Sequence, residues 1–209
     1  PSQESFIRIY PTKISNDKLE RKNQVSVEVL KDPEDPREES HKMPKSKSQW
    51  KKLHEKMEVQ KQLDREEWIE LIEDLPKDSI QDLKDQDRSM GLVDPEIEDA
   101  FVEERENVDE IQKDLNGMPL RDKETYPYRP KIKYQCKGNC TVQSLHSQQI
   151  LEWGIYEFWR YNCPDRYPYD EFQGALNLFD DGWKHYFLVG NMRHHPTSFI
   201  VISDLRYKN

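Results

Sequence analysis

The stretch YQCKGNCTVQSLHSQQILEWGIYEFWRYN, Tyr134–Asn162, holds two of the three cysteines and the strongest apolar helical pattern of the chain. From Val142 onward, apolar side chains recur on nearly all sides at 100° per residue, which is typical of a buried helix. Cys163–Pro164 would end this helix, because the residue before a proline disfavours helical backbone. We therefore predict a buried helix over Val142–Asn162.

Several short apolar runs predict strands that could pack on this helix. The runs WKHYFLVGN, Trp183–Asn191, and PTSFIVISDL, Pro196–Leu205, predict an antiparallel hairpin. We expect an α+β fold: a small antiparallel sheet packed on the buried C-terminal helix, with an acidic helical middle segment. The sheet would take its strands from near Ile7, Val27, Ile132, Phe187 and Ile200.

The middle of the chain is polar and reads as short helices. Asp64 with Glu67 three residues on has the spacing of a capping box, and Pro76 and Pro95 can each open a further helix. Three prolines in 31–45 predict a linker. The predicted organisation is 1–30, N-terminal strands joining the core sheet; 31–45, linker; 46–118, charged helical segment; 119–209, aromatic-rich core domain.

The charge is unevenly distributed. The net charge of −9 excludes a protein that is basic as a whole, as nucleic-acid binders often are. Residues 41–62, however, carry seven lysines against two glutamates. We call 41–61 the basic arm and expect it to be a solvated surface or a contact for nucleic acid or an acidic partner. Candidate partner-binding residues are Lys45, Lys47, Lys51, Lys52, Arg193, His194 and His195.

Targeting signals are not visible in the sequence. It has no apolar run of about 18 residues that could span a membrane, and its N-terminus lacks the pattern of a signal peptide. Three cysteines do not form a disulfide framework, so we expect a reduced, cytoplasmic protein without membrane contact.

The sharpest chemical signal is Cys136-x3-Cys140-x5-His146. Thiolates and a neutral imidazole are the usual ligands of zinc, and a Gly–Asn turn between the cysteines would let both thiols point inward. Two interpretations stay open: a zinc site, structural if a fourth protein ligand completes it, or two buried thiols beside a hydrogen-bonded histidine.

The fourth ligand is not evident from spacing. If His146 and Cys163 belong to one helix, they lie roughly 25 Å apart, too far to share one ion. His185, His194, His195, an acidic residue or water remain as candidates, and water would make the site catalytic in form. Candidate catalytic residues are His146, Glu152 and Arg160. No phosphate-binding loop or nucleophile elbow is present.

The string His146-Ser-Gln148-Gln-Ile150-Leu-Glu152-Trp153, with Phe187-x-Val189-Gly190-Asn191…His195-Pro196-x-x-Phe199, resembles a family of uncharacterised prokaryotic proteins. That family shows a cysteine pair, then His-x-Gln-x-Ile-x-Asp-Trp-Glu, then Phe-Phe-x-Gly-Asn…His-Pro-x-x-Phe. The segments Asp35–Ser40 and Ser89–Pro95 and the Trp68 helix resemble it too. The resemblance implies no established activity. Glu152 replaces Asp and Gly154 replaces Glu, which favours a structural role here.

Together these features favour a non-enzymatic cytoplasmic accessory protein that acts through a protein partner. It would be stabilised by zinc and linked to a nucleic-acid-processing or antiviral defence complex. The alternative is a metal-dependent, nuclease-like hydrolase that uses Cys136, Cys140 and His146, with Glu152 as base.

Overall fold

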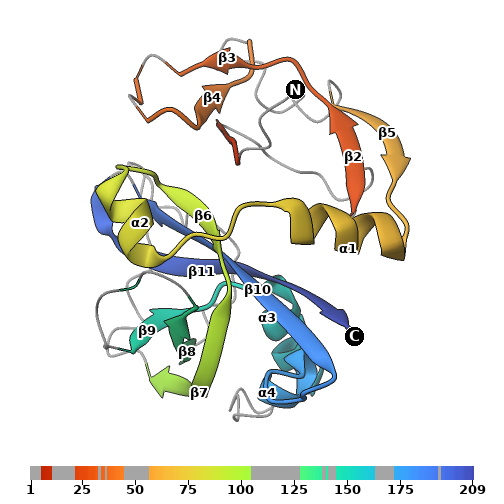
Figure 1. The fold of residues 1–209 in the computed structure, drawn as a ribbon, viewed down its shortest axis with the longest axis vertical. Helices are drawn as coiled ribbons and strands as arrows, with labels where there is room; N and C mark the ends of the chain where they lie inside the picture. Colours follow the sequence, from red (N-terminus) through yellow and green to blue (C-terminus); the bar gives the residue numbers. More distant parts are fainter. Residues whose placement is uncertain are drawn as a thin grey trace, which may run out of the picture. The chain divides into compact units, whose positions relative to one another are not determined.

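The computed structural model describes residues 6–10, 22–32, 34–35, 37–44, 57–104, 128–137, 140, 145–162, 172–192 and 194–209. Strands predominate over helices in this part of the chain, and the strands form several small sheets (Figure 1). The α+β expectation is therefore wrong: the fold is mostly β, and no sheet packs on a long C-terminal helix.

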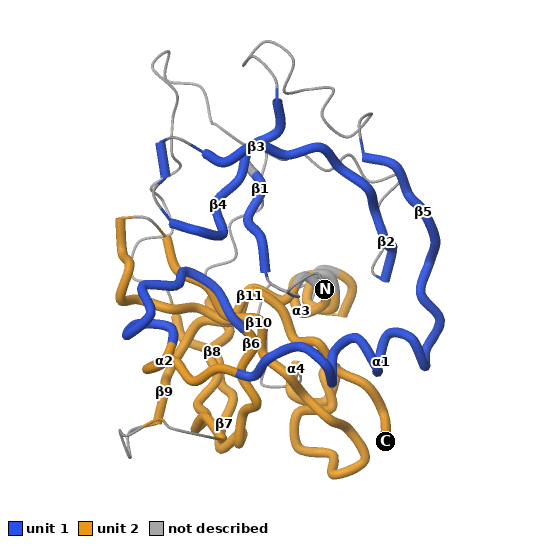
Figure 2. Tube along the Cα trace, turned by 45° about the horizontal axis from the view of Figure 1, so that its top comes forward, with its two compact units in different colours: residues 1–77, 83–91 blue, residues 78–82, 92–209 orange. Residues whose placement is uncertain are grey.

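The chain divides into two compact units, coloured separately in Figure 2. Unit 1 comprises residues 1–77 and 83–91, and unit 2 comprises residues 78–82 and 92–209. The predicted domain boundaries at 45/46 and 118/119 lie outside the described residues, so the four-part division stays a prediction.

The described residues of unit 1 form two small sheets. β4 is the centre of a three-stranded sheet, parallel to β1 and antiparallel to β3, whereas β2 and β5 form an antiparallel pair. β1 and β2 thus lie in two separate sheets of unit 1, and the expectation that they join one sheet with the strands near Ile132, Phe187 and Ile200 is wrong. β4 also lies inside the proline-rich stretch 31–45. The strands are β1 Arg8–Tyr10, β2 Asn23–Ser26, β3 Leu30–Lys31, β4 Ser40–Lys42 and β5 Glu58–Gln62.

The helix α1, Arg65–Asp74, begins as the sequence predicts. The Asp64 side chain accepts a hydrogen bond from the backbone N–H of Glu67 at 2.9 Å, and the Glu67 carboxylate accepts one from the N–H of Asp64 at 3.2 Å. This reciprocal pair satisfies two N–H groups that have no partner within the helix. The expected helical segment before Asp64 is absent at 58–62, where the chain forms β5.

A three-stranded antiparallel sheet of unit 2 carries the metal-ligand candidates. Its order is β7-β8-β9, with β7 Pro95–Glu104, β8 Tyr128–Cys136 and β9 His146–Gln149. β7 was predicted to be a helix. Its acidic side chains lie across from lysines of β8, with Asp99 at 3.2 Å from Lys133 and Glu103 at 3.3 Å from Lys131. Cross-strand pairing overrides the local helical pattern.

The predicted C-terminal hairpin is confirmed: β10, Trp183–Met192, pairs antiparallel with β11, His195–Lys208. In Figure 1 these are the two long blue strands. β6, Met90–Val93, is the third strand of that sheet, and its residues Leu92 and Val93 belong to unit 2. The backbone N–H of Leu151 donates to Val201 of β11 at 2.7 Å, so the chain after β9 is tied to this sheet.

Three short helices complete the described elements: α2 Ile80–Asp85, α3 Trp153–Asn162 and α4 Phe172–Leu176. The predicted helix Val142–Asn162 is wrong in its first part, because His146–Gln149 forms β9 and only the later residues form α3. Trp159 of α3 is fully buried against Phe172 of α4, edge to face at 6.1 Å. The core of unit 2 therefore combines α3 and α4 with buried residues of β8, β10 and β11.

No helix in the described part of the chain is both long enough and apolar enough to cross a membrane.

Candidate metal centre

The pleat of the β8–β9 pair gathers the first two ligand candidates. Side chains alternate between the faces of a strand, so Tyr134 and Cys136 share the buried face of β8. His146 is the register partner of Tyr134 and therefore projects on that same face of the sheet. Cys136 and His146 are thus diagonal neighbours across the two strands. This arrangement depends on His146 lying in a strand, and not in the helix predicted for Val142–Asn162.

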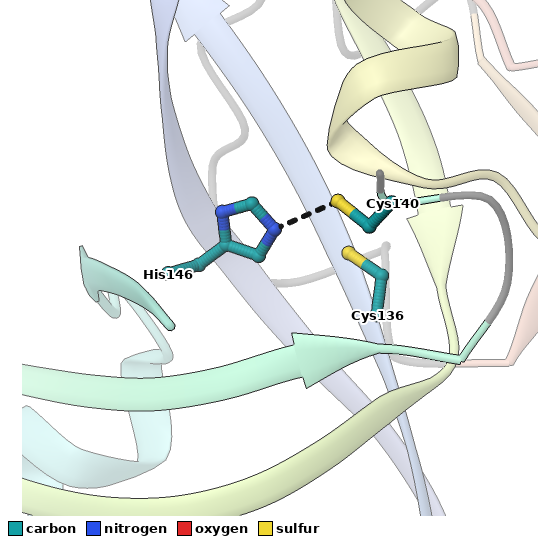
Figure 3. Close-up of side chains that lie close together, drawn as sticks. All are labelled: Cys136, Cys140 and His146. Carbon is teal, nitrogen blue, oxygen red and sulfur yellow. Dashed lines mark hydrogen bonds between the residues drawn. The ribbon is translucent and has the colours of Figure 1, made fainter. Parts of the chain in front are cut away.

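Cys140 completes a group of three. The ligand atoms of Cys136, Cys140 and His146 all lie within 4.8 Å of one another. The Sγ of Cys140 lies 3.1 Å from Nε2 of His146. In Figure 3 both sulfur atoms and the imidazole ring point toward a common centre. Cys136 is buried, whereas Cys140 and His146 are half-buried, so the group is reachable from solvent on one side.

Burial disfavours the thiolate form of Cys136. Burial raises the pKa of this thiol to about 12, and a backbone hydrogen bond from Ile80, the first residue of α2, acts in the opposite direction. Burial also raises the pKa of Tyr134 well above its ordinary value, with further contributions from Cys136 and Cys140. A divalent cation would replace the thiol protons and compensate the charge.

The side chains around the group are fixed by their own contacts. The Tyr134 hydroxyl donates to Oε1 of Gln148 at 2.9 Å, and its ring packs edge to face on Phe187 at 5.2 Å. The same ring lies 5.3 Å from the ring of His146. A ligand set held in this way does not have to be ordered again when a metal binds.

Two thiols and one imidazole fit zinc better than magnesium or calcium, which prefer oxygen ligands. Within the described residues, no further histidine, cysteine or carboxylate joins the group as a fourth ligand. The predicted cofactor is supported to this extent: the structure contains a three-ligand group at metal-binding distance, with a donor set that suits zinc.

The fourth-ligand candidates can now be placed. His185 is engaged elsewhere: its Nδ1 lies 3.1 Å from both carboxylate oxygens of Asp204, and its Nε2 lies 3.1 Å from the carbonyl oxygen of Asn177. His194 and His195 are exposed where β10 turns into β11 and are not in the group. Cys163 lies outside the described residues. The distance argument against it no longer holds, because it assumed one helix from His146 to Cys163.

Glu152, the candidate base, is not part of the metal group. Its carboxylate is buried and accepts hydrogen bonds from the hydroxyl of Ser203 at 2.7 Å and from the backbone N–H of Asp204 at 2.9 Å. This carboxylate therefore joins the segment between β9 and α3 to β11. Its geometry is that of a structural brace.

The remaining predicted site residues cannot be located. Arg160 lies in α3, but its side chain is not described, and Lys45, Lys47, Lys51, Lys52 and Arg193 lie outside the described residues. The basic arm and its contacts therefore stay predictions.

A buried ionic cluster in unit 2 was not predicted from the sequence. Asp204 is fully buried and pairs with His185 and with Arg206, whose Nη1 lies 3.1 Å away. Asp204 and Arg206 are two residues apart on β11 and so lie on the same face of the strand, and His185 is the register partner of Arg206. Recognising this cluster requires the hairpin register, which the sequence alone does not fix.

Residues of the family-like string have structural partners here. Besides Gln148 and Glu152, Asn191 donates to the carbonyl oxygen of Pro196 at 2.6 Å and braces the turn of the hairpin. In unit 1, the backbone N–H of Ser89 donates to Glu39 at 2.5 Å, which joins the Asp35–Ser40 and Ser89–Pro95 segments. The hydrogen bonds of these residues therefore indicate roles in holding the fold together and do not indicate a reaction.

Comparison of the chain with protein-family models, with curated proteins and with solved structures returns no match. The resemblance to uncharacterised prokaryotic proteins therefore stays an expectation, and function has to be argued from the residues above.

Proposed function

We propose that this is a non-enzymatic interaction protein of the cytoplasm, in which unit 2 is stabilised by a zinc ion on Cys136, Cys140 and His146. The observation that carries the proposal is the convergence of these three ligand atoms within 4.8 Å. The ion would join Cys136 at the end of β8 and His146 of β9 to Cys140. Structural zinc sites of small domains act in this way, because metal affinity adds directly to folding stability.

The placement of Glu152 supports a structural role over a catalytic one. A metal-bound water needs a nearby base to become a nucleophile efficiently. The carboxylate predicted for this task is instead buried in hydrogen bonds to Ser203 and Asp204. His185, a candidate fourth ligand, is likewise held against the buried Asp204 and is not in the metal group.

Exposed apolar side chains in unit 1 support contact with a protein partner. Val25 and Val59 are register partners on the β2–β5 pair and are 37% and 44% exposed. Ile7 and Leu30 are 45% and 49% exposed. For the basic arm we keep nucleic acid, in a processing or defence complex, as a second class of partner. Binding to DNA or RNA that weakens steeply with salt would support it, and no binding at low salt would remove it.

One observation favours the alternative, a metal-dependent hydrolase: the group has three described ligands, which leaves a coordination position for water. Such an enzyme would need a base other than Glu152. The two functions differ in the fourth ligand, which X-ray absorption spectroscopy of the zinc-loaded protein identifies as sulfur or nitrogen from the protein, or as water oxygen.

The direct test is the metal content of protein purified without added zinc. We expect bound zinc in the parent chain and its loss in His146→Ala and Cys140→Ser. His194→Ala is the matched control, because His194 is exposed and outside the group, and it should keep the metal. Cys163→Ser reports on the fourth position. A parent chain that contains no zinc and takes up none would refute the proposal.

A further inference from the structure

The two cysteines of the metal group differ in solvent exposure. Cys136 is buried at the end of β8, whereas Cys140 is half-buried. Cys140 also lies beside His146, with Sγ and Nε2 3.1 Å apart. A thiol that solvent can reach is the kind that reacts with peroxides.

Cys136 provides a second thiol next to Cys140 that could react with an oxidised Cys140. The sulfur atoms of Cys136 and Cys140 belong to the same 4.8 Å group. A redox-sensitive cysteine commonly stands next to a second thiol that converts its sulfenic acid into a disulfide. The buried thiol is suited to this second role, because a peroxide reaches it less easily than it reaches Cys140.

We propose that Cys140 is an oxidative modification site for hydroperoxides, and that Cys136 closes the oxidised Cys140 into a disulfide that releases the metal. The disulfide step rests on the geometry of the two thiols. Only the metal-release step rests on the zinc site proposed above.

The chemistry balances without any further reactant. In the first step the Cys140 sulfur of the zinc-free thiol attacks one oxygen of the hydroperoxide. An S–O bond forms, the O–O bond breaks, and the leaving oxygen takes the Cys140 proton and departs as an alcohol or water. In the second step the Cys136 sulfur attacks the Cys140 sulfur, an S–S bond forms, and the S–O bond breaks; the leaving hydroxide takes the Cys136 proton and departs as water. The two thiols together lose two electrons, which the hydroperoxide gains.

Oxidation would convert the metal group from three ligands to one. Both thiolates become part of the disulfide, and only His146 keeps a lone pair for zinc. A single imidazole does not hold the ion, so oxidation and metal release are one event. A dithiol reductant would reverse both.

The experiment treats zinc-loaded and zinc-stripped full-length protein with hydrogen peroxide, blocks the remaining thiols and maps the peptides. We expect a Cys136–Cys140 disulfide, loss of two alkylatable thiols, release of the bound zinc to a chromogenic indicator, and recovery of both with dithiothreitol. In Cys136→Ser, Cys140 should stop at the sulfenic acid and react with dimedone. In the zinc-stripped arm, Cys163→Ser is the matched control and should form the same disulfide as the parent.

The possible failures are distinguishable. If the chain binds no zinc, the zinc-stripped arm still reports whether the disulfide forms. If zinc is bound but peroxide leaves both thiols alkylatable, or joins either to Cys163, the modification site is refuted and the metal site stands. The parent peptide map alone decides this, so the conclusion does not depend on the folding of any variant.

Discussion

At the scale of single residues, the hydrogen-bond partners of Glu152 distinguish a structural carboxylate from a catalytic base. Its carboxylate accepts from Ser203 and from the backbone of Asp204, 51 and 52 residues further along the chain. A buried acceptor with several donors contributes to the free energy of folding mainly through the cost of leaving those donors without a partner.

We therefore predict that Glu152→Ala lowers the free energy of unfolding by about 1–3 kcal/mol and leaves the zinc content unchanged. Urea denaturation and metal analysis measure the two effects. Glu96→Ala, an exposed acidic residue of the same unit, is the matched control and should change neither. Loss of zinc in Glu152→Ala at full stability would contradict the assignment and return Glu152 to the metal site.

Asp35 is the corresponding carboxylate of unit 1. It accepts hydrogen bonds from Nε and Nη2 of Arg37 and from the hydroxyl of Ser40. The Arg37 hydrogen bonds, opposed by burial, hold the pKa of Asp35 well below its ordinary value. In Glu39, burial raises the pKa, but hydrogen bonds from Ser89 and from the Glu39 backbone, together with the Arg37 charge, outweigh it and the net pKa is lowered.

A carboxyl whose pKa is lower in the folded state stabilises the fold above its unfolded pKa and loses that contribution as the pH falls. We therefore expect the stability of unit 1 to decrease as the pH falls below about 4, the unfolded pKa of Asp. Asp35→Asn should cost about 1–3 kcal/mol at pH 7 and weaken this acid dependence. Chemical denaturation between neutral and acid pH measures both. An unchanged acid dependence in Asp35→Asn would contradict the role given to Asp35.

At the scale of elements, α1 is the clearest case in which local sequence is sufficient. The capping box is written in residues 64–67, and the structure contains both of its hydrogen bonds. We predict that Asp64→Ala destabilises α1 by about 0.5–2 kcal/mol. Hydrogen exchange of peptides covering 64–75 measures the change. Glu70→Ala, at an exposed position inside the helix, should have little effect. Equal effects of the two variants would show that the cap contributes nothing.

β7 and β9 show where local sequence fails. Each has residues that suit a helix, and each is a strand because β8 lies beside it. The informative signal was long-range: the acidic run PEIEDAFVEE is complementary to the basic run YRPKIKYQC. The metal ligands were nonetheless found by residue type and spacing. The sequence did not predict that His146 lies near Cys136 because both residues project from the same face of paired strands.

At the scale of the whole molecule, the stabilising interactions differ between the two units. The Asp35 and Glu39 interactions lie in unit 1, and all three metal ligands lie in unit 2. Zinc at about a hundredfold over its dissociation constant would stabilise the folded state by about 2.7 kcal/mol. A chelator should remove this stabilisation from unit 2 first.

Hydrogen exchange at constant pH, with and without a chelator, tests this. Peptides from β8 and β9 should lose protection when zinc is removed, while peptides from β4 and α1 should not. The His146→Ala variant is the control and should show no further change with chelator. Equal loss of protection in both units would mean that they unfold together, which this prediction excludes.

The chain passes between the two units three times, at 77/78, 82/83 and 91/92. Any single recombination breakpoint therefore leaves one unit incomplete, so neither can be inherited as an independent module. The short segment 78–82 belongs to unit 2 and includes Ile80, whose backbone forms a hydrogen bond with Cys136. Among descendants of this gene, substitutions in 78–82 should be constrained together with the three metal ligands, although more than fifty residues separate them.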